Sequence, residues 1–428
     1  MDFSNYEAKV TSEIPYFFMG KGSRFSTVKF TVVMKDEVDG EILRHAAHKA
    51  AARFPYLSVK LDLRQDGLYL VHNPLPLAVI CTEAPVKLCA EETNYHLHAV
   101  TYTKHTIQIP ALHALYDGLG GTRFRQTLLY YYCQEKYDAD LKAPDGAYLL
   151  GNEIDEGEYE NPFASEKLKG ISAPASAADG EGMAYTVFSD NELTETDHRC
   201  LLLKINESDF QCFCKQNGTS VFAMSIILYA KAINSFRTDK SKPIVIGYPT
   251  NARNVLGVEK TVRPAVVPCG IALTDSQLNM TLPELGEYVK ASVKKSISED
   301  VLMRSAAKTK QDYDGIADIP VKEVYEKVGR HMSSADSPLI SYMGRLQWGD
   351  MLRYIKYGFS TGNFPSSIIC QENSMNGYLT MSFNQTILED KYVRAICAEL
   401  DKNGIGYELE ALEADPIAYA DQIFDFEN

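Results

Sequence analysis

The 428-residue sequence predicts an α/β protein built of two lobes. Three observations lead to this prediction. Strand-like and helix-like segments alternate along most of the chain, which favours layers of helices on sheets. The length exceeds what one hydrophobic core normally supports, so two units are the natural division. Between residues 141 and 192 the periodicity disappears and Asp, Glu, Gly, Pro, Ala and Ser dominate, as in an exposed connection between lobes.

In the first half, the pattern predicts a strand, a helix and two hairpins. A strand at 30–34 precedes Asp39, after which apolar residues recur at helical spacing. An Asp-Gly turn at 66–67 joins two short alternating runs, the pattern of a β-hairpin. A second hairpin is expected from extended runs at 97–103 and 106–112, with a polar turn between them.

The second half resumes with a strand at 200–205 and a helix from about Glu207. A nearly all-apolar helix follows, and Thr219 or Ser220 is suited to cap it. Two further strands and two amphipathic helices are expected at 243–248, 264–273, 282–298 and 387–400. This alternation continues the α/β pattern of the first half.

The net charge, the hydropathy and the cysteine content indicate which partners and which cellular compartment to expect. The formal net charge of −14 disfavours nucleic acid, whose phosphates attract basic surfaces, and anionic lipid. The longest apolar run is too short to cross a bilayer, and the first residues lack the features of a signal peptide. Nine cysteines without C-x-x-C spacing indicate reduced thiols. We therefore expect a cytoplasmic protein with no membrane span.

The most informative motif is His113-Ala-Leu-Tyr-Asp117-Gly118. Side chains alternate along a strand, so His113 extends the buried row of the 106–112 strand and can meet a pocket as a neutral imidazole. A glycine-rich turn and a tyrosine-rich helix follow. The alternative interpretation is structural: His113 is a hydrogen-bonded strand-end histidine, and Asp117 caps the free N–H groups of the helix.

Other motifs in the sequence give weaker evidence of a functional site. His45 and His48 lie three residues apart on the polar face of one helix, but no third ligand is nearby, so we expect no metal site. The nucleophile elbow G-x-S-x-G and the phosphate loop G-x-x-x-x-G-K-[ST] are both absent from the sequence.

The hairpin, the H-x-x-x-D-G string, the glycine turn and the tyrosine-rich helix together resemble the chloramphenicol-acetyltransferase-like superfamily. This group includes nonribosomal-peptide condensation domains and alcohol acetyltransferases. The segments 53–57, 248–253 and 341–344 are similar to further family motifs. Two departures are that Leu112 replaces the first of the family's paired histidines and that the plant members' D-F-G-W-G string is absent.

The resemblance implies two lobes, each a mixed sheet flanked by helices, with a tunnel between them. We place the first lobe at 1–165, the crossover linker at 166–192 and the second lobe at 193–428. The resemblance implies an acyltransferase that moves an acyl group from a thioester, expected to be acyl-CoA, to an alcohol or amine. Acyl-CoA would be a co-substrate, with no bound cofactor.

The resemblance also assigns roles within the site. His113 would take the acceptor's proton, while Asp117 would turn away from substrate and pair with Arg253. Gly118 and Arg253 would support the site, and Ser341 is the candidate hydrogen-bond donor to the oxyanion. Three alternatives stay open: a condensation-type enzyme that takes its acyl group from an acyl carrier protein, a catalytically silent binding module, and an unrelated α/β protein with a chance motif.

Overall fold

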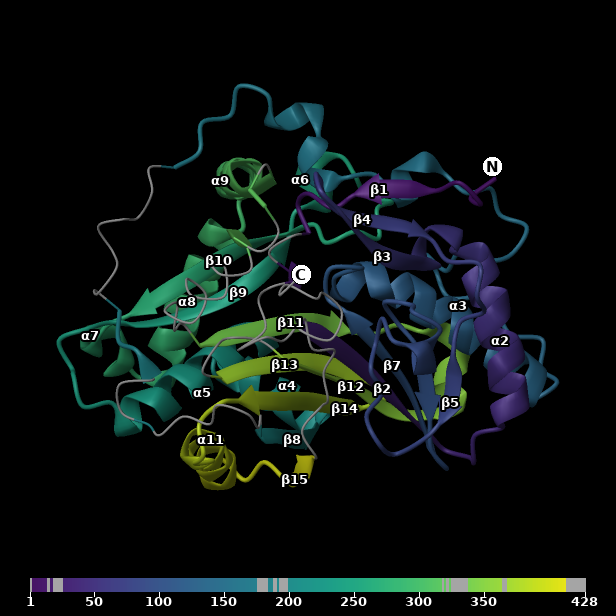
Figure 1. Cartoon of the computed structure of the whole chain (residues 1–428). Coiled ribbons are helices and arrows are strands. Elements are labelled where there is room, and N and C mark those ends of the chain that lie inside the picture. The colour runs from purple at the N-terminus through teal and green to yellow at the C-terminus, as the bar shows by residue number, and fades with distance from the viewer. Residues whose placement is uncertain are drawn as a thin grey trace.

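The computed structural model describes residues 2–13, 16–17, 26–174, 184–187, 191, 199–317, 319–320, 323–324, 338–363 and 368–412. These residues form two α/β lobes that lie side by side, each with its own sheet and hydrophobic core (Figure 1). The sheets contain both parallel and antiparallel pairs, which confirms the predicted fold class of mixed sheets flanked by helices.

The first lobe contains a five-stranded sheet, a separate three-stranded sheet and two long helices that pack against each other (Figure 1). The strand order of the larger sheet is β12 (Ile355–Asn363), β2 (Thr27–Met34), β7 (Thr106–Leu112), β6 (Val100–Tyr102) and β5 (Val79–Cys81). The smaller sheet has the order β1 (Glu7–Lys9), β4 (Gly67–His72) and β3 (Val59–Arg64), and the helices are α2 (Gly40–Arg53) and α3 (Gly118–Lys136).

The second lobe contains a seven-stranded sheet with helices packed on it. The strand order is β10 (Val266–Leu273), β9 (Ile244–Asn251), β11 (Leu339–Arg345), β13 (Ile368–Met375), β14 (Tyr378–Gln385), β8 (Arg199–Asn206) and β15 (Tyr407–Leu412). The helices are α4 (Glu207–Gln216), α5 (Val221–Phe236), α6 (Arg253–Leu256), α7 (Asp275–Leu278), α8 (Leu282–Ser296), α9 (Glu299–Ala317) and α11 (Lys391–Lys402). No single described helix meets the length and hydropathy expected of a membrane span; α4 and α5 meet them only as a pair bent by 82°.

Local chemistry explains several of the predicted elements. The Asp39 carboxylate accepts the N–H groups of the first turn of α2, and the Ser220 hydroxyl does the same for α5. The predicted Asp-Gly hairpin is β3–β4, where Gly67 adopts a φ of 141° that favours glycine. The predicted strand at 106–112 coincides with β7.

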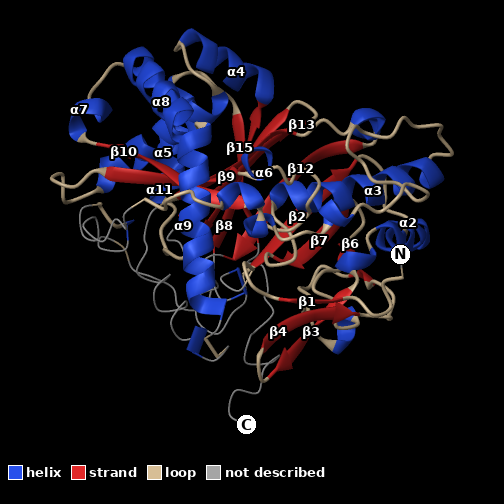
Figure 2. Ribbon diagram, turned by 90° about the horizontal axis from the view of Figure 1, so that it is seen from above, coloured by secondary structure: helices blue, strands red, loops and turns tan. Residues whose placement is uncertain are grey.

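One strand crosses between the lobes. β12 comes from the second half of the chain but pairs antiparallel with β2 along its whole length, from Ile355 opposite Met34 to Asn363 opposite Thr27 (Figure 2). The expected boundary of the second lobe, 193–428, therefore needs a correction, because residues 355–363 belong to the sheet of the first lobe. The sequence did not indicate that this strand pairs with the first lobe, because two strands can form hydrogen bonds however far apart they lie in the chain.

The segment 141–192, which we expected to be exposed and without periodicity, contains three short 3-10 helices, η3 (Glu156–Glu158), η4 (Pro162–Ala164) and η5 (Glu166–Leu168), of which only η5 lies in the linker expected at 166–192. Glu158 is buried and accepts hydrogen bonds from Arg53 at 2.7 Å and from the Tyr56 hydroxyl at 2.6 Å, so this part is packed rather than exposed. Residues 175–183, 188–190 and 192 of the expected linker lie outside the described residues, as do residues 193–198 of the expected second lobe.

Candidate functional site

His113 lies in the turn between β7 and α3. Its backbone N–H donates to the Ser26 carbonyl at 2.9 Å, and its half-buried imidazole lies 5.0 Å from the ring of Tyr16, centroid to centroid. Burial lowers the pKa of His113 below 6.5, although hydrogen bonding to the backbone and the charge of Asp117 oppose this shift. The imidazole is therefore neutral at pH 7 and able to accept a proton.

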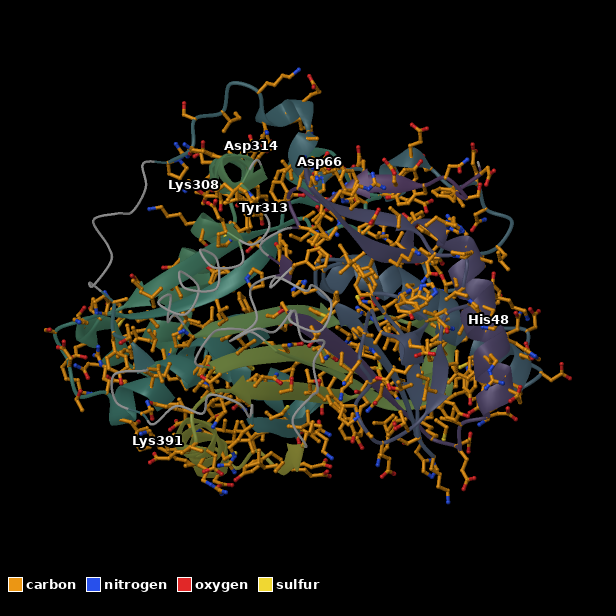
Figure 3. All side chains as sticks on the ribbon, viewed as in Figure 1. His48, Asp66, Lys308, Tyr313, Asp314 and Lys391 are labelled. Atoms are coloured by element: carbon orange, nitrogen blue, oxygen red, sulfur yellow. The ribbon has the colours of Figure 1, made fainter. Side chains whose placement is uncertain are left out.

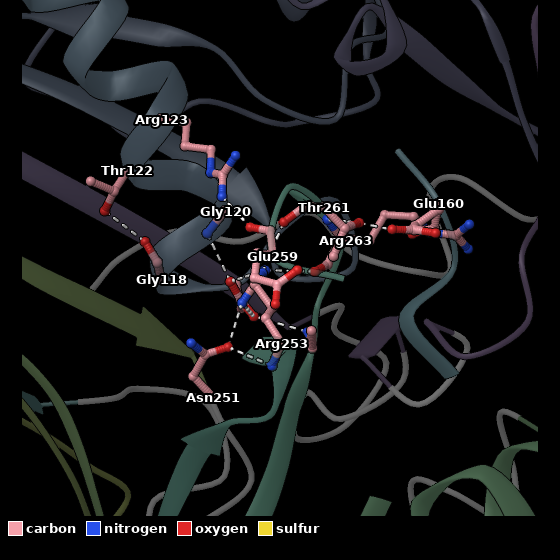
Figure 4. Close-up of polar contacts among 12 residues, drawn as sticks. Gly118, Gly120, Thr122, Arg123, Glu160, Asn251, Arg253, Glu259, Thr261 and Arg263 are labelled. Atoms are coloured by element: carbon pink, nitrogen blue, oxygen red, sulfur yellow. Dashed lines mark hydrogen bonds and ion pairs between the residues drawn. The ribbon is translucent and has the colours of Figure 1, made fainter. Parts of the chain in front are cut away.

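The Asp117 carboxylate forms a buried ion pair with Arg253, whose contacts Figure 4 shows. Its Oδ1 accepts the Gly120 N–H at 2.9 Å, which caps α3, and its Oδ2 accepts the Ala265 N–H at 2.9 Å. Arg253 binds both oxygens, each at 2.9 Å. Burial alone would raise the pKa of Asp117, but Arg253 and the two backbone donors hold it below its ordinary value, so the group stays ionised.

The Arg253 guanidinium is 1% exposed and uses all of its N–H groups. Besides Asp117, it donates to the Thr261 carbonyl at 2.9 Å, the Arg263 carbonyl at 2.8 Å and the Asn251 side chain at 3.1 Å (Figure 4). The pairing expected from the sequence is thus present, and it ties α3 of the first lobe to the β9–β10 region of the second.

The glycines after Asp117 allow close contact between the lobes. A Cβ at Gly120 would lie 1.9 Å from the Val262 carbonyl oxygen, so no larger residue fits there. Gly118 faces Met343 of β11, and its carbonyl accepts hydrogen bonds from Thr122 at 2.8 Å and Arg125 at 2.6 Å. Gly118 therefore helps to hold the first turn of α3 in place.

A cavity of about 390 Å³ lies between the lobes. Ser341 lines it together with Asp117, Gly118 and Arg253, while His113 is not among its described lining residues. The other residues that line it come from α3, from β9 to β11 and from the segment after β11: Leu119, Thr122, Gln126, Pro249, Asn251, Val266, Tyr342, Met343, Arg345, Leu346, Gln347 and Trp348. The structure thus brings Ser341 close to the Asp117 loop, but it shows no contact between Ser341 and His113.

The sequence analysis missed an aromatic residue beside His113. Tyr16 is buried against the imidazole, and its phenol interacts with that of Tyr313 on α9, which Figure 3 labels. Burial, opposed by Tyr313, raises the pKa of Tyr16 to about 12, so this phenol stays protonated. No motif marks either tyrosine, because the contact depends on segments from opposite ends of the chain.

The remaining histidines have other surroundings. His48 lies exposed on the outer face of α2, where Figure 3 labels it, and His45 bonds Glu135 at 3.0 Å. His96 and His98 are buried, and burial lowers the pKa of His98 to about 3. Within the described residues, no group of three or more His, Cys, Asp or Glu side chains is arranged to hold a metal ion.

No protein-family profile matches the sequence, and no curated protein matches it. Solved structures do match. Polyketide synthase associated protein 5 from Mycobacterium tuberculosis has a TM-score of 0.66 and 15% identity, over 94% of this chain and 98% of that one. F. sporotrichioides TRI101, solved with coenzyme A and T-2, has a TM-score of 0.59 and 10% identity, over 94% and 99%.

The TRI3 trichothecene 15-O-acetyltransferase from Fusarium sporotrichioides has a TM-score of 0.56 and 9% identity, over 92% of this chain and 94% of that one. At such identities the likeness establishes the fold alone. The chain shares the two-lobe α/β fold of these proteins, which agrees with the fold that the sequence resemblance predicted.

Proposed function

We propose that the protein is an acyltransferase that moves an acyl group from a thioester, acyl-CoA in the first instance, to an alcohol or amine. The observation that carries the proposal is a neutral, half-buried imidazole, His113, on a loop that an interlobe ion pair fixes in place. Two proteins of the same fold support the choice of reaction: one was solved with coenzyme A, and the other is an O-acetyltransferase.

In this mechanism His113 removes the proton from the acceptor's O–H or N–H as that atom attacks the thioester carbonyl carbon. The carbonyl π electrons move to oxygen, and a hydrogen-bond donor stabilises the resulting oxyanion. Ser341 is the donor that we propose, because it faces the interlobe cavity. When the intermediate collapses, the C–S bond breaks and protonated His113 returns its proton to the thiolate. Asp117 and Arg253 act as positioning residues.

The test is a screen of acyl-CoA thioesters against alcohols and amines, with release of free thiol as the readout. On the best pair, His113→Ala should lower kcat/KM by about 10²- to 10⁴-fold. The matched control is His48→Ala on the outer face of α2, which should keep full activity and the same melting temperature. Equal turnover by wild type and His113→Ala would reject this mechanism, and a collapse in melting temperature would favour the purely structural role.

A second candidate takes the acyl group from a carrier protein. It is favoured by the likeness to polyketide synthase associated protein 5, whose name associates it with a polyketide synthase. The same assay, run with an acyl group on a phosphopantetheinylated carrier protein, separates the two donors. Faster turnover from the carrier than from coenzyme A would establish this alternative. Binding of ligands without turnover on either donor would instead support the silent module.

A further inference from the structure

A second cavity, of about 880 Å³, lies beside the small sheet of the first lobe and has more than twice the volume of the interlobe cavity. The residues that line it come from the chain before and within β1, from β3 and β4, and from the segment 89–95. None of these described residues lines the interlobe cavity, and the small sheet lies at the margin of the first lobe (Figure 2). The second cavity is therefore separate from the proposed acyl-transfer site.

The segment 89–95 holds an exposed aromatic ring at this cavity. Tyr95 lines the cavity, is 46% exposed and has a φ of 62°, next to Asn94 with a φ of 52°. Such left-handed backbone is rare for a bulky residue and persists only where neighbouring contacts enforce it. Here the Tyr95 N–H donates to the Ala90 carbonyl at 2.8 Å, and the Asn73 side-chain amide donates to the Asn94 carbonyl at 2.7 Å. The fold thus fixes the position of an aromatic ring that water still contacts.

The charged side chains that line this cavity differ in whether they are paired. Arg64 lies between two carboxylates: its Nε donates to Asp62 at 2.9 Å and its Nη2 donates to Glu7 at 2.9 Å. The ammonium group of Lys60 is exposed and makes no ion pair or hydrogen bond with the described residues. Burial raises the pKa of the Cys89 thiol, so this group adds no charge. An anion that enters the cavity would therefore find a cation available, whereas a cation would find both carboxylates already bound.

We propose that this second cavity binds a small aromatic carboxylate, whose ring packs on Tyr95 and whose carboxylate pairs with the Lys60 ammonium group. Lys60 lies directly opposite Val71 of β4, so the cation and an apolar side chain share one face of the small sheet. A bound ring would remove apolar surface of Tyr95 and Val71 from water. The volume is within the range of small-molecule sites. This site is additional to the proposed acyl-transfer site and does not depend on it.

The experiment measures binding with two probes, naphthalene-2-carboxylate and naphthalene-2-carboxamide, which share the ring and nearly the same shape but differ in charge. Calorimetric titration gives their dissociation constants for wild type, Lys60→Gln and Tyr95→Asn. Asn is chosen at position 95 because its side chain tolerates the left-handed backbone there. The matched controls are Lys215→Gln on α4 and Tyr288→Asn on α8, two exposed residues that are not among the described lining of either cavity.

Wild type and Lys215→Gln should bind the carboxylate about 2- to 5-fold more tightly than the carboxamide, the value of one exposed ion pair. Lys60→Gln should lose that preference. Tyr95→Asn should weaken the binding of both probes by about 2- to 10-fold, the value of one aromatic contact, whereas Tyr288→Asn should bind them as wild type does. Because Lys60 is exposed, Lys60→Gln keeps the proposal testable if Tyr95→Asn does not fold.

The proposal is overturned if wild type shows no preference for the carboxylate, if Lys60→Gln retains it, or if a folded Tyr95→Asn binds both probes as tightly as wild type. Binding of the probes in the interlobe cavity would give the second and third of these results. Failure of the proposed function is a separate outcome, because the probes carry no thioester. Full activity of His113→Ala would reject the acyl-transfer mechanism and leave these dissociation constants unchanged.

Discussion

Two buried carboxyl groups behave in opposite ways. Asp117, between the lobes, is 3% exposed, and its two oxygens accept four hydrogen bonds, two of them from Arg253. Glu372, on β13 within the second lobe, is 1% exposed; Ser225 donates to its Oε1 at 3.0 Å, and its Oε2 has no partner among the described residues. The pKa of Asp117 is lowered, whereas burial raises the pKa of Glu372 to about 8.

The comparison shows that donors, rather than burial, decide the charge of a carboxyl group in this fold. Asp117 is ionised at neutral pH, because its pKa lies below the ordinary value, and it therefore keeps its ion pair with Arg253. Glu372 is mostly protonated at pH 7 and gains its charge only in alkaline solution. The Asp117 carboxylate therefore forms an ion pair at neutral pH, whereas the charge of Glu372 changes with pH in the neutral to alkaline range.

The largest loss of stability is expected when the ion pair between Asp117 and Arg253 is removed. Asp117→Ala leaves Arg253 buried without its carboxylate and should lower the free energy of unfolding by about 3–5 kcal/mol. Chemical denaturation of Asp117→Ala, Arg253→Met and the double variant gives the coupling energy. Strictly additive losses would mean that the contact in the structure contributes no coupling.

Glu372→Gln tests whether the protonation of Glu372 makes stability depend on pH. Because the folded-state pKa is raised, the folded protein holds a proton that the unfolded chain releases between about pH 4.5 and 8. Wild-type stability should therefore fall as pH rises through this window, by at most about 1.4 kcal/mol per unit. Denaturation at several pH values should show this decline in wild type and in Glu156→Gln, an exposed control, but not in Glu372→Gln. A decline of equal slope in all three proteins would assign it to other groups.

A third test applies the same reasoning to His113. Burial lowers its pKa, so the neutral base should persist to lower pH than in an ordinary histidine. The acid limb of kcat/KM should have its midpoint below pH 6.5, and activity should be constant from there to neutral pH. An acid limb centred above 6.5 would contradict this account of the imidazole's environment.

The smallest effect is expected at Tyr16. Tyr16→Phe keeps the ring against His113 and removes only the phenol that interacts with Tyr313. We expect a loss of about 2- to 10-fold in kcat/KM, the value of one hydrogen bond, and a larger loss for Tyr16→Ala, which removes the ring. The position of the acid limb is the discriminating readout: it should be closer to the wild-type value in Tyr16→Phe than in Tyr16→Ala.

The sequence predicted those parts of the fold that depend on neighbouring residues. The caps Asp39 and Ser220 and the β7 strand follow from local chemistry and periodicity, and the fold class follows from their alternation. The H-x-x-x-D-G string predicts His113 and Asp117 as site residues, and the resemblance predicts the pairing of Arg253 with Asp117, which is present in the structure.

What the sequence did not predict depends on distant residues. Tyr16 reaches His113 across almost one hundred residues, and no pattern records that contact. Glu372 stands in a polar run, Gln371 to Ser374, that is buried on both faces of β13, contrary to what its composition indicates.

The crossing strand β12 has a consequence for synthesis of the protein. β2 ends at residue 34, but its outer neighbour β12 begins only at residue 355. At about 5–20 residues per second, translation of the intervening segment takes roughly 15–65 s. During this interval β7 can pair with one edge of β2, but the edge that later pairs with β12 has no partner strand, and such edges promote aggregation. The sheet of the first lobe is thus begun at residue 27 but completed only when residues 355–363 have been made, so expression of residues 1–165 alone would leave that edge of β2 open.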